Sequence, residues 1–245
     1  MNYNQTYIQD LVIADKEKIN LDEIYLDATN RAQIEQLIKE HKYIETLQAY
    51  GLPVNNKILL HGHSGCGKTM TAKAIATALN KQIVILNLSN VVSSRIGETS
   101  QHLKMVFDKI GRDKAVLFLD EFDQIGKERG NDAKDVGEMR RLVNSLIQLI
   151  DYFPNNALLL CATNHLDIID TALIRRFQLK LTYELPDQAA LETYYTQLLS
   201  KYPASLQNID RQYNISFAEA KDHALTAVKA MLIEQLEAGT LAPVS

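Results

Sequence analysis

The sequence has little of what marks several protein classes. Its 245 residues include two cysteines, Cys66 and Cys161, which are too few for a disulfide framework, so we expect a reducing, cytoplasmic location. Its longest apolar runs, 115–119 and 157–162, are far shorter than the roughly 18 residues of a membrane helix. The polar start, residues 1–5, has no signal-peptide pattern. We therefore expect neither a secreted nor a membrane protein.

A strong charge of one sign is also missing. Lysine and arginine number 26 against 30 aspartates and glutamates, which gives a net charge of −4. This mild balance favours neither a nucleic acid nor an anionic membrane, so we expect no membrane partner and disfavour a nucleic-acid partner. A length of 245 residues, of which 46% are hydrophobic, suits one large globular domain or one domain with a small appendage.

Short apolar runs alternate with longer helical patterns in the middle of the chain. The runs predict strands at Lys57–His61, Gln82–Leu88, Ala115–Asp120, Ala157–Thr163 and Gln178–Tyr183, and the patterns predict helices at Thr69–Leu79, Glu98–Ile110 and Val136–Ile150. This alternation indicates βαβ units and a parallel sheet. A further helical pattern covers residues 27–49, and two more, at 188–200 and 216–237, indicate a small helical subdomain after Pro186.

A glycine-rich segment follows the first predicted strand and precedes a predicted helix. It fits the pattern G-x-x-x-x-G-K-[ST] with the residues Gly62, His63, Ser64, Gly65, Cys66, Gly67, Lys68 and Thr69. Glycines let successive backbone N–H groups turn toward phosphates, and the helix adds its positive dipole end. We predict that this segment, through Met70, binds ATP, with Lys68 on the phosphates and the Thr69 hydroxyl on Mg²⁺. We interpret Cys66 as a small filler rather than a redox switch.

Two adjacent carboxylates, Asp120 and Glu121, end the predicted strand at 115–120. Because neighbouring strand residues point to opposite faces, we expect the two side chains to have different roles. Asp120 suits Mg²⁺ coordination, and Glu121 suits polarising an attacking water as a general base. A merely solvated strand end is the weaker interpretation beside a phosphate loop.

Three further polar residues leave two interpretations open. Asn164 follows the predicted strand at 157–163, where its amide could position a water or contact the γ-phosphate, or could only cap a turn. Arg175 and Arg176 end a short helical stretch, where they could complement its dipole or supply an arginine finger that stabilises transition-state charge. Local sequence does not decide between these roles.

The order of these motifs resembles the AAA family within the AAA+ ATPases. The likeness extends from about Asp22 to Glu237 and rests on the phosphate loop, Leu119-Asp120-Glu121, Ala162-Thr163-Asn164 and the segment 170–177. It implies an α/β fold, a P-loop NTPase three-layer αβα core with a five-stranded parallel sheet in the order 5-1-4-3-2, and a small C-terminal helical lid. It also implies an N-terminal arm at residues 1–26, the ATPase core at 27–186 and the lid at 187–245.

The resemblance assigns roles to single residues as well. It implies that Lys68, Asp120, Glu121 and Asn164 act in their own subunit and that an arginine acts in a neighbour's site. The family normally separates its two arginines by Pro-Gly, whereas Arg175 and Arg176 are adjacent here, which leaves open whether one or both act in trans. We favour Arg175 as the finger and Arg176 as its support. The family's first pore loop aligns with Arg95, Ile96 and Gly97, where Arg95 replaces the usual aromatic residue.

These expectations describe an enzyme that hydrolyses ATP with Mg²⁺. The resemblance implies a ring-shaped homo-oligomer, with six subunits expected, that couples hydrolysis to remodelling a separate protein partner. One alternative is a DNA-linked ATPase of the loader or transposition-helper type, which predicts stimulation by DNA. Another is a small-molecule P-loop kinase, which predicts activity as a monomer and leaves residues 175–177 unexplained.

Overall fold

The sheet has six strands in the order β1-β3-β4-β5-β2-β6 in a computed structural model, which describes residues 12–88, 96–125 and 133–239. The strands are β1 (Val12–Asp15), β2 (Lys57–Gly62), β3 (Ile83–Asn87), β4 (Val116–Asp120), β5 (Leu158–Thr163) and β6 (Leu179–Tyr183). Apart from β1 these are the five predicted strands. They form a parallel sheet in the order 5-1-4-3-2, which confirms the predicted fold class.

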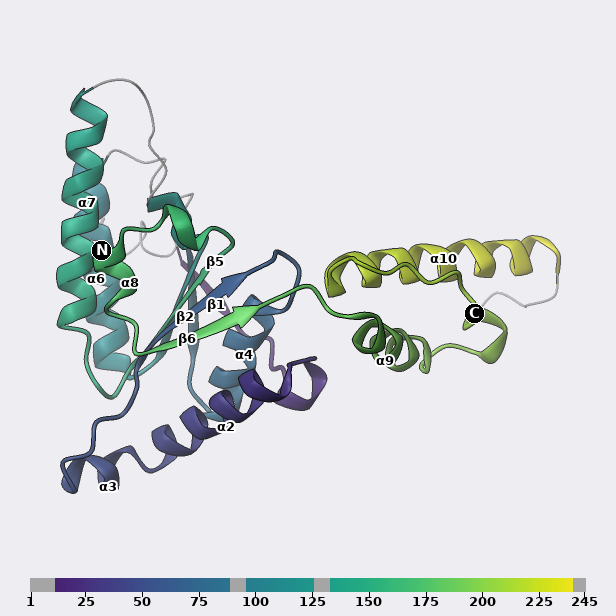
Figure 1. The fold of residues 1–245 in the computed structure, drawn as a ribbon, viewed down its shortest axis with the longest axis horizontal. Coiled ribbons are helices and arrows are strands. Elements are labelled where there is room, and N and C mark those ends of the chain that lie inside the picture. The colour runs from purple at the N-terminus through teal and green to yellow at the C-terminus, as the bar shows by residue number, and fades with distance from the viewer. Residues whose placement is uncertain (1–11, 89–95, 126–132, 240–245) are drawn as a thin grey trace, which may run out of the picture. The chain divides into compact units, whose positions relative to one another are not determined.

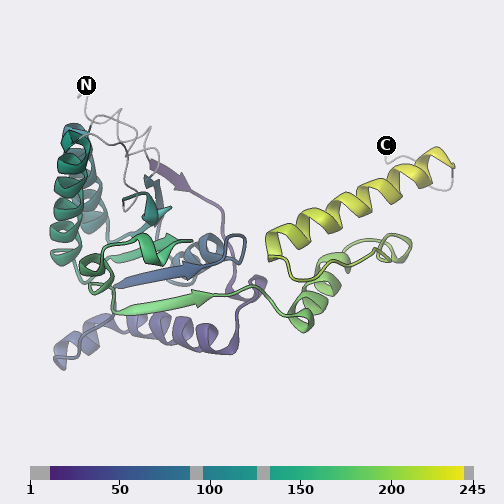
Figure 2. The ribbon, with the colours of Figure 1, turned by 45° about the horizontal axis from the view of Figure 1, so that its top comes forward.

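Helices cover both faces of the sheet, as Figures 1 and 2 show. One side carries α6 (Ile96–Asp113), α7 (Ala133–Asp151) and α8 (Thr171–Ile174), and the other carries α2 (Ala28–Lys42) and α4 (Lys68–Ala78). The short helix α3 (Ile44–Ala49) follows α2 and lies beyond the strands. Short 3-10 turns are η1 (Leu21–Glu23), η2 (Phe122–Ile125) and η3 (Leu166–Ile168). The single helical pattern predicted at 27–49 is therefore two helices. They are divided at Tyr43, whose φ of −108° and ψ of 21° depart from helical values.

The main core lies between the sheet and helices α6 and α7. β4 contributes Leu117 and Leu119, and β5 contributes Cys161, all fully buried. Phe107 of α6 packs edge-on against Phe153, with ring centroids 5.6 Å apart. Because the central strands are covered on both faces, their sequences are almost continuously apolar rather than alternating.

The edge strand β1 is the one strand that the sequence did not predict. It pairs antiparallel with β3, with Val12 opposite Leu86. Beside it, the Lys73 ammonium of α4 forms ion pairs with Asp15 at 2.7 Å and Glu17 at 2.6 Å. The hydrogen bond from Lys73 lowers the pKa of the Asp15 carboxyl below its ordinary value. The segment is therefore held by pairing and charge contacts that its own sequence does not reveal.

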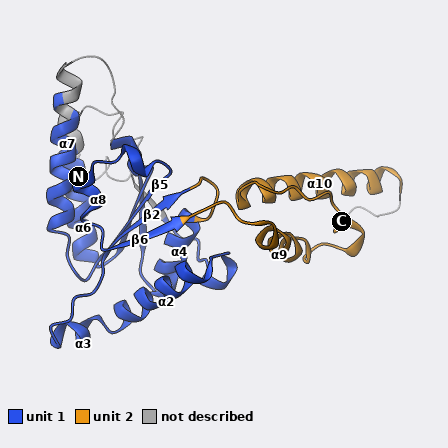
Figure 3. Ribbon diagram, viewed as in Figure 1, with its two compact units in different colours: residues 1–62, 68–182 blue, residues 63–67, 183–245 orange. Residues whose placement is uncertain are grey.

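The chain divides into two compact units, which Figure 3 colours separately. The larger unit comprises residues 1–62 and 68–182, and the smaller joins 63–67 to 183–245. The smaller unit packs around the fully buried Tyr195 and contains α9 (Gln188–Leu199), the turn η4 (Ala204–Leu206) and α10 (Phe217–Glu237). The segment 63–67 follows β2 in sequence, yet its contacts place it with the helices.

Within the described ranges, none of the helices combines the length and the hydropathy that crossing a membrane requires.

Candidate active site

The glycine-rich loop runs from the end of β2 to the start of α4. Gly62, Gly65 and Gly67 have φ angles of 128°, 72° and 99°, in the region that residues with a Cβ rarely adopt. Between them His63 and Ser64 are exposed and Cys66 is buried, with its Sγ 3.6 Å from the Ser64 carbonyl oxygen. The loop's conformation therefore requires its glycines, and Cys66 fills space inside it.

The loop segment 63–67 is bound to the helical unit through its backbone. The His63 N–H donates to the Tyr183 carbonyl at 2.8 Å, and the Ala218 N–H donates to the Gly65 carbonyl at 3.1 Å. A Cβ on Gly65 would lie 2.5 Å from the Ser216 Oγ, so only glycine fits against the start of α10. Ser216 in turn caps α10 in a capping box with Glu219. The beginning of α10 thus holds the loop in place.

Lys68, Thr69 and Asp120 converge at the carboxyl ends of β2 and β4. The Lys68 side chain is 8% exposed and donates from Nζ to the Gly62 carbonyl at 2.8 Å. The Thr69 hydroxyl donates to Asp120 Oδ2 at 3.3 Å, while Met70, one residue on, is exposed. Burial raises the pKa of the Asp120 carboxyl above its ordinary value, with the Lys68 charge acting in the opposite direction.

These oxygens fit a divalent cation. Thr69 Oγ1 and Asp120 Oδ2 are hard oxygen ligands and lie within hydrogen-bond distance of each other. A cation beside them would favour the charged form of the Asp120 carboxyl, which burial disfavours. In the described part of the chain, no three histidine, cysteine, aspartate or glutamate side chains gather into a metal site of their own. A Mg²⁺ ion here would therefore take its remaining ligands from phosphate oxygens and water.

Glu121 follows the last residue of β4 and has a positive φ of 54°. Its N–H donates to Asp120 Oδ1 at 2.9 Å. A non-glycine residue in this conformation is uncommon and concentrates at functional sites. The two carboxylates are therefore separated by a turn of the backbone, and not by the strand alternation on which we based their different roles.

Asn164 lies just beyond β5 and is exposed. Its side chain makes no hydrogen bond with any residue that the structure describes, so nothing here supports the interpretation as a cap. The preceding Thr163 is buried and donates from Oγ1 to Asp123 Oδ1 at 3.0 Å, and it accepts the His165 N–H at 3.0 Å. Asp123 is 3% exposed, and its contact ties the end of β5 to the turn after Glu121.

We did not predict this Thr163–Asp123 contact from the sequence. The available signal was an aspartate between the apolar Phe122 and Ile125, at a position too buried for an unsatisfied carboxylate.

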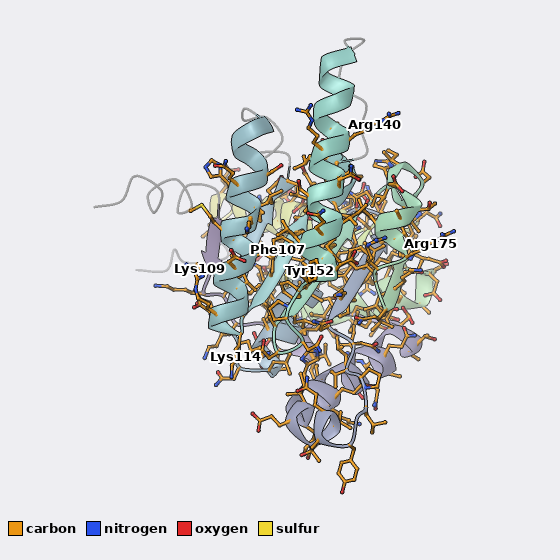
Figure 4. The ribbon with its side chains drawn as sticks, turned by 90° about the vertical axis from the view of Figure 1, so that its left-hand side faces the viewer. Phe107, Lys109, Lys114, Arg140, Tyr152 and Arg175 are labelled. Atoms are coloured by element: carbon orange, nitrogen blue, oxygen red, sulfur yellow. The ribbon has the colours of Figure 1, made fainter. Side chains whose placement is uncertain are left out.

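Arg175 and Arg176 differ in what their side chains contact. Arg175 caps the C-terminus of α8, is exposed, and makes no side-chain hydrogen bond or ion pair with any described residue. Figure 4 shows it at the edge of the core unit, pointing outward. The Arg176 guanidinium forms an ion pair with Asp151, from Nε to Oδ1 at 2.9 Å and from Nη2 to Oδ2 at 3.1 Å. Phe177 is buried edge-on against Phe122, with centroids 5.7 Å apart.

The structure describes two of the three predicted pore-loop residues. Arg95 lies outside the described residues, and Ile96 and Gly97 are the first two residues of α6. Their role stays a prediction.

Comparisons with known proteins show which family the chain resembles. The model of the ATPase family associated with various cellular activities (AAA) matches residues 58–185, from β2 to just beyond β6. An AAA family ATPase of Sinorhizobium fredii, y4kL, is 32% identical over 88% of the chain and 66% of its own length. The proteasome-associated ATPase of Streptosporangium roseum is 29% identical over 78% of the chain and 36% of its own length. The chain thus spans about two thirds of one relative and about a third of the other.

Among solved structures, the crystal structure of the FIGL-1 AAA domain matches the fold. Its TM-score is 0.73, and the match covers 97% of this chain and 82% of that one at 19% identity. At this identity the likeness concerns the fold alone.

Proposed function

The chain belongs to the AAA family of ATPases, and from this membership and the geometry of the site we propose that it hydrolyses ATP at sites shared between neighbouring subunits of a ring. The observation that carries the proposal is the convergence of Lys68 and Thr69, the last two residues of the glycine-rich motif, with Asp120, because the Thr69 and Asp120 oxygens are 3.3 Å apart. A positively charged, main-chain-lined loop followed by a helix suits a nucleoside triphosphate.

The loop and its following helix bind the phosphates in this proposal. Backbone N–H groups of residues 62–70 contact the phosphate oxygens, and the Lys68 ammonium exchanges the Gly62 carbonyl for the β- and γ-phosphates. Thr69 and Asp120 would hold Mg²⁺, which would supply positive charge to offset that of the phosphates. Burial makes each of these charge contacts stronger than it would be in water.

Glu121 and Asn164 act on the attacking water. Glu121, which has a positive φ of 54° just after β4, accepts its proton as the general base. The Asn164 amide, which has no partner among the described residues, is available to orient the water or contact the γ-phosphate. The hydrogen bond from Thr163 to Asp123 joins the backbone just before Asn164 to the backbone just after Glu121.

Arg175 completes a neighbouring subunit's site. It is an exposed cation whose side chain finds no partner in the described chain, and its backbone is fixed at the end of α8. An arginine supplied in trans stabilises the charge that develops on the transferred phosphate. We expect six subunits and a separate protein as the substrate that the ring remodels. The proteasome-associated ATPase among the relatives supports a protein substrate.

The experiment replaces Glu121 by Gln, which keeps size and binding contacts but removes the base. We expect ATP to bind and the protein to accumulate as an ATP-loaded oligomer, with phosphate release reduced about a hundredfold or more. Light scattering measures the ring size, and co-purification reads out the partner protein. The Glu237→Gln variant, at the exposed end of α10, should behave like the unmodified protein. Unimpaired phosphate release by Glu121→Gln would remove Glu121 from its assigned role.

A further inference from the structure

The two arginines after α8 differ in what holds them, and this difference leads to an inference that rests on the proposed function. We infer that Asp151 is a positioning residue for the neighbour's ATP site. Its carboxylate holds the Arg176 guanidinium in place, and this contact fixes the backbone from which the Arg175 side chain extends. Asp151 is the last residue of α7 and is distant in sequence from the motifs of the site.

The ion pair occupies most of the Arg176 guanidinium. Nε and Nη2 donate to the two carboxylate oxygens of Asp151 at 2.9 and 3.1 Å, and Nη1 donates to the Ala172 carbonyl of α8. This parallel, two-point contact fixes the orientation of both planar groups, which a single contact would not. Arg176 would have to break all three contacts before it could reach a phosphate in another subunit.

The other side of the turn is fixed by aromatic packing. Phe177 is buried, and its ring meets Phe122 at 89°, with Phe122 adjacent to Glu121. The Arg175 N–H donates to the Thr171 carbonyl at 3.1 Å. The backbone that follows Arg175 is therefore held by two contacts: the ion pair of Arg176 with Asp151, and the packing of Phe177 against Phe122. Among residues 175–177, the Arg175 side chain alone makes no hydrogen bond, ion pair or ring contact with a described residue.

This ion pair is expected to orient the Arg176 side chain more than to stabilise the fold. The side chains of Arg176 and Asp151 are 29% and 43% exposed, and ion pairs this exposed contribute little to the free energy of unfolding. Rates, in contrast, depend steeply on the placement of charged groups. Asp151 also faces a second cation, because its charge raises the pKa of Lys57 against the larger lowering effect of burial. Removing the Asp151 charge would leave Lys57 and Arg176 opposing each other.

The test replaces Asp151 by Asn in the full chain. We expect the kcat for ATP to fall about tenfold, with KM changed less than about twofold and the unfolding temperature nearly unchanged. The matched control is Asp113→Asn, which removes an exposed aspartate at the end of α6 and should leave kcat unchanged. Arg176→Lys keeps the charge but loses the two-point contact, so it should show the same loss. It also carries the test if Asp151→Asn does not fold.

A double-mutant cycle separates positioning from a general structural role. If Asp151 acts through Arg175, then Asp151→Asn should cause no further loss in an Arg175→Ala background, measured by single-turnover phosphate release. The same tenfold loss in both backgrounds, or no loss in the single variant, would overturn the inference. If Arg175→Ala keeps full turnover, the shared-site proposal fails as well. If Arg175→Ala loses turnover and Asp151→Asn does not, only the role of Asp151 is refuted.

Discussion

The phosphate loop, residues 62–69, and the arginine turn, residues 175–177 after α8, obtain their conformations by different means. The loop depends on its backbone, because three glycines have positive φ angles and Gly65 packs where a Cβ would meet Ser216 at 2.5 Å. The arginine turn has an ordinary helical backbone, with φ of −67° at Arg175. It depends on side chains from elsewhere, namely Asp151 against Arg176 and Phe122 against Phe177.

This difference explains why one region is visible in the sequence and the other is not. Glycines at fixed spacing show that a loop needs unusual backbone angles, so a short pattern identifies it. Side-chain anchors come from distant positions and leave no local pattern. The contrast predicts that the loop tolerates no added Cβ, whereas the turn tolerates changes that keep its anchors.

The largest effect should come from Arg175, the free end of the arginine turn. Arg175→Ala should leave ATP binding intact and reduce turnover about a hundredfold or more, because a trans arginine stabilises transition-state charge. Steady-state hydrolysis and ATP affinity measure the two effects separately. Arg140→Ala, which removes another exposed arginine from the same side of the core unit, is the control and should keep its activity. Normal turnover by Arg175→Ala would mean that the turn has no catalytic part.

The loop is tested by a pair of glycines with nearly equal φ angles. Gly65→Ala combines a positive φ of 72° with the clash against Ser216, whereas Gly51→Ala has a φ of 73° and meets nothing within 4 Å. We expect Gly51→Ala to lose about 1 kcal/mol of stability, and Gly65→Ala to lose more and to bind ATP about tenfold more weakly. Chemical denaturation and ATP titration measure both. Equal losses of stability in the two variants would show that packing on Ser216 does not matter.

A smaller effect is expected at the start of α10. Ser216→Ala removes the helix cap and should lower the free energy of unfolding by about 1 kcal/mol, while Ser145→Ala, within α7, should change it by less than about 0.5 kcal/mol. Ser216→Ala also removes the oxygen that a Cβ on Gly65 would meet. The double variant of Gly65 and Ser216 should therefore lose less than the sum of the single losses. Strict additivity would contradict direct packing between loop and cap.

The smallest effect is expected at His41, which lies outside the loop and the arginine turn, and it concerns the pH dependence of stability. Burial lowers the pKa of His41 below its ordinary 6.5, and its Nε2 lies 2.8 Å from the Asn55 carbonyl oxygen. The unfolded chain therefore takes up a proton before the folded one, so stability should fall as the pH drops from about 6.5 toward the lowered pKa. A His41→Gln variant should show a shallower decline over this window in denaturation curves. An identical decline would exclude His41 as a source.

Prediction from sequence succeeded where the information is local. Continuous apolar strands gave the parallel sheet, and the spacing of Gly62, Gly67 and Lys68 gave the loop. The strand β1 was missed because four residues form it only by pairing with β3. The pairing of Arg176 with Asp151 was missed for the same reason, since 25 residues separate the two. Tertiary partners of this kind have no periodic signature.

The central claim is that one subunit's arginine serves another subunit's ATP site, and mixing two inactive variants tests it most directly. Arg175→Ala retains its own site but offers no arginine, and Glu121→Gln lacks the base but offers Arg175. When the two are co-assembled, we predict that ATP hydrolysis exceeds that of either variant alone by about tenfold or more. Mixed rings, verified by native mass spectrometry, that hydrolyse no faster than the average of the two variants would contradict the account.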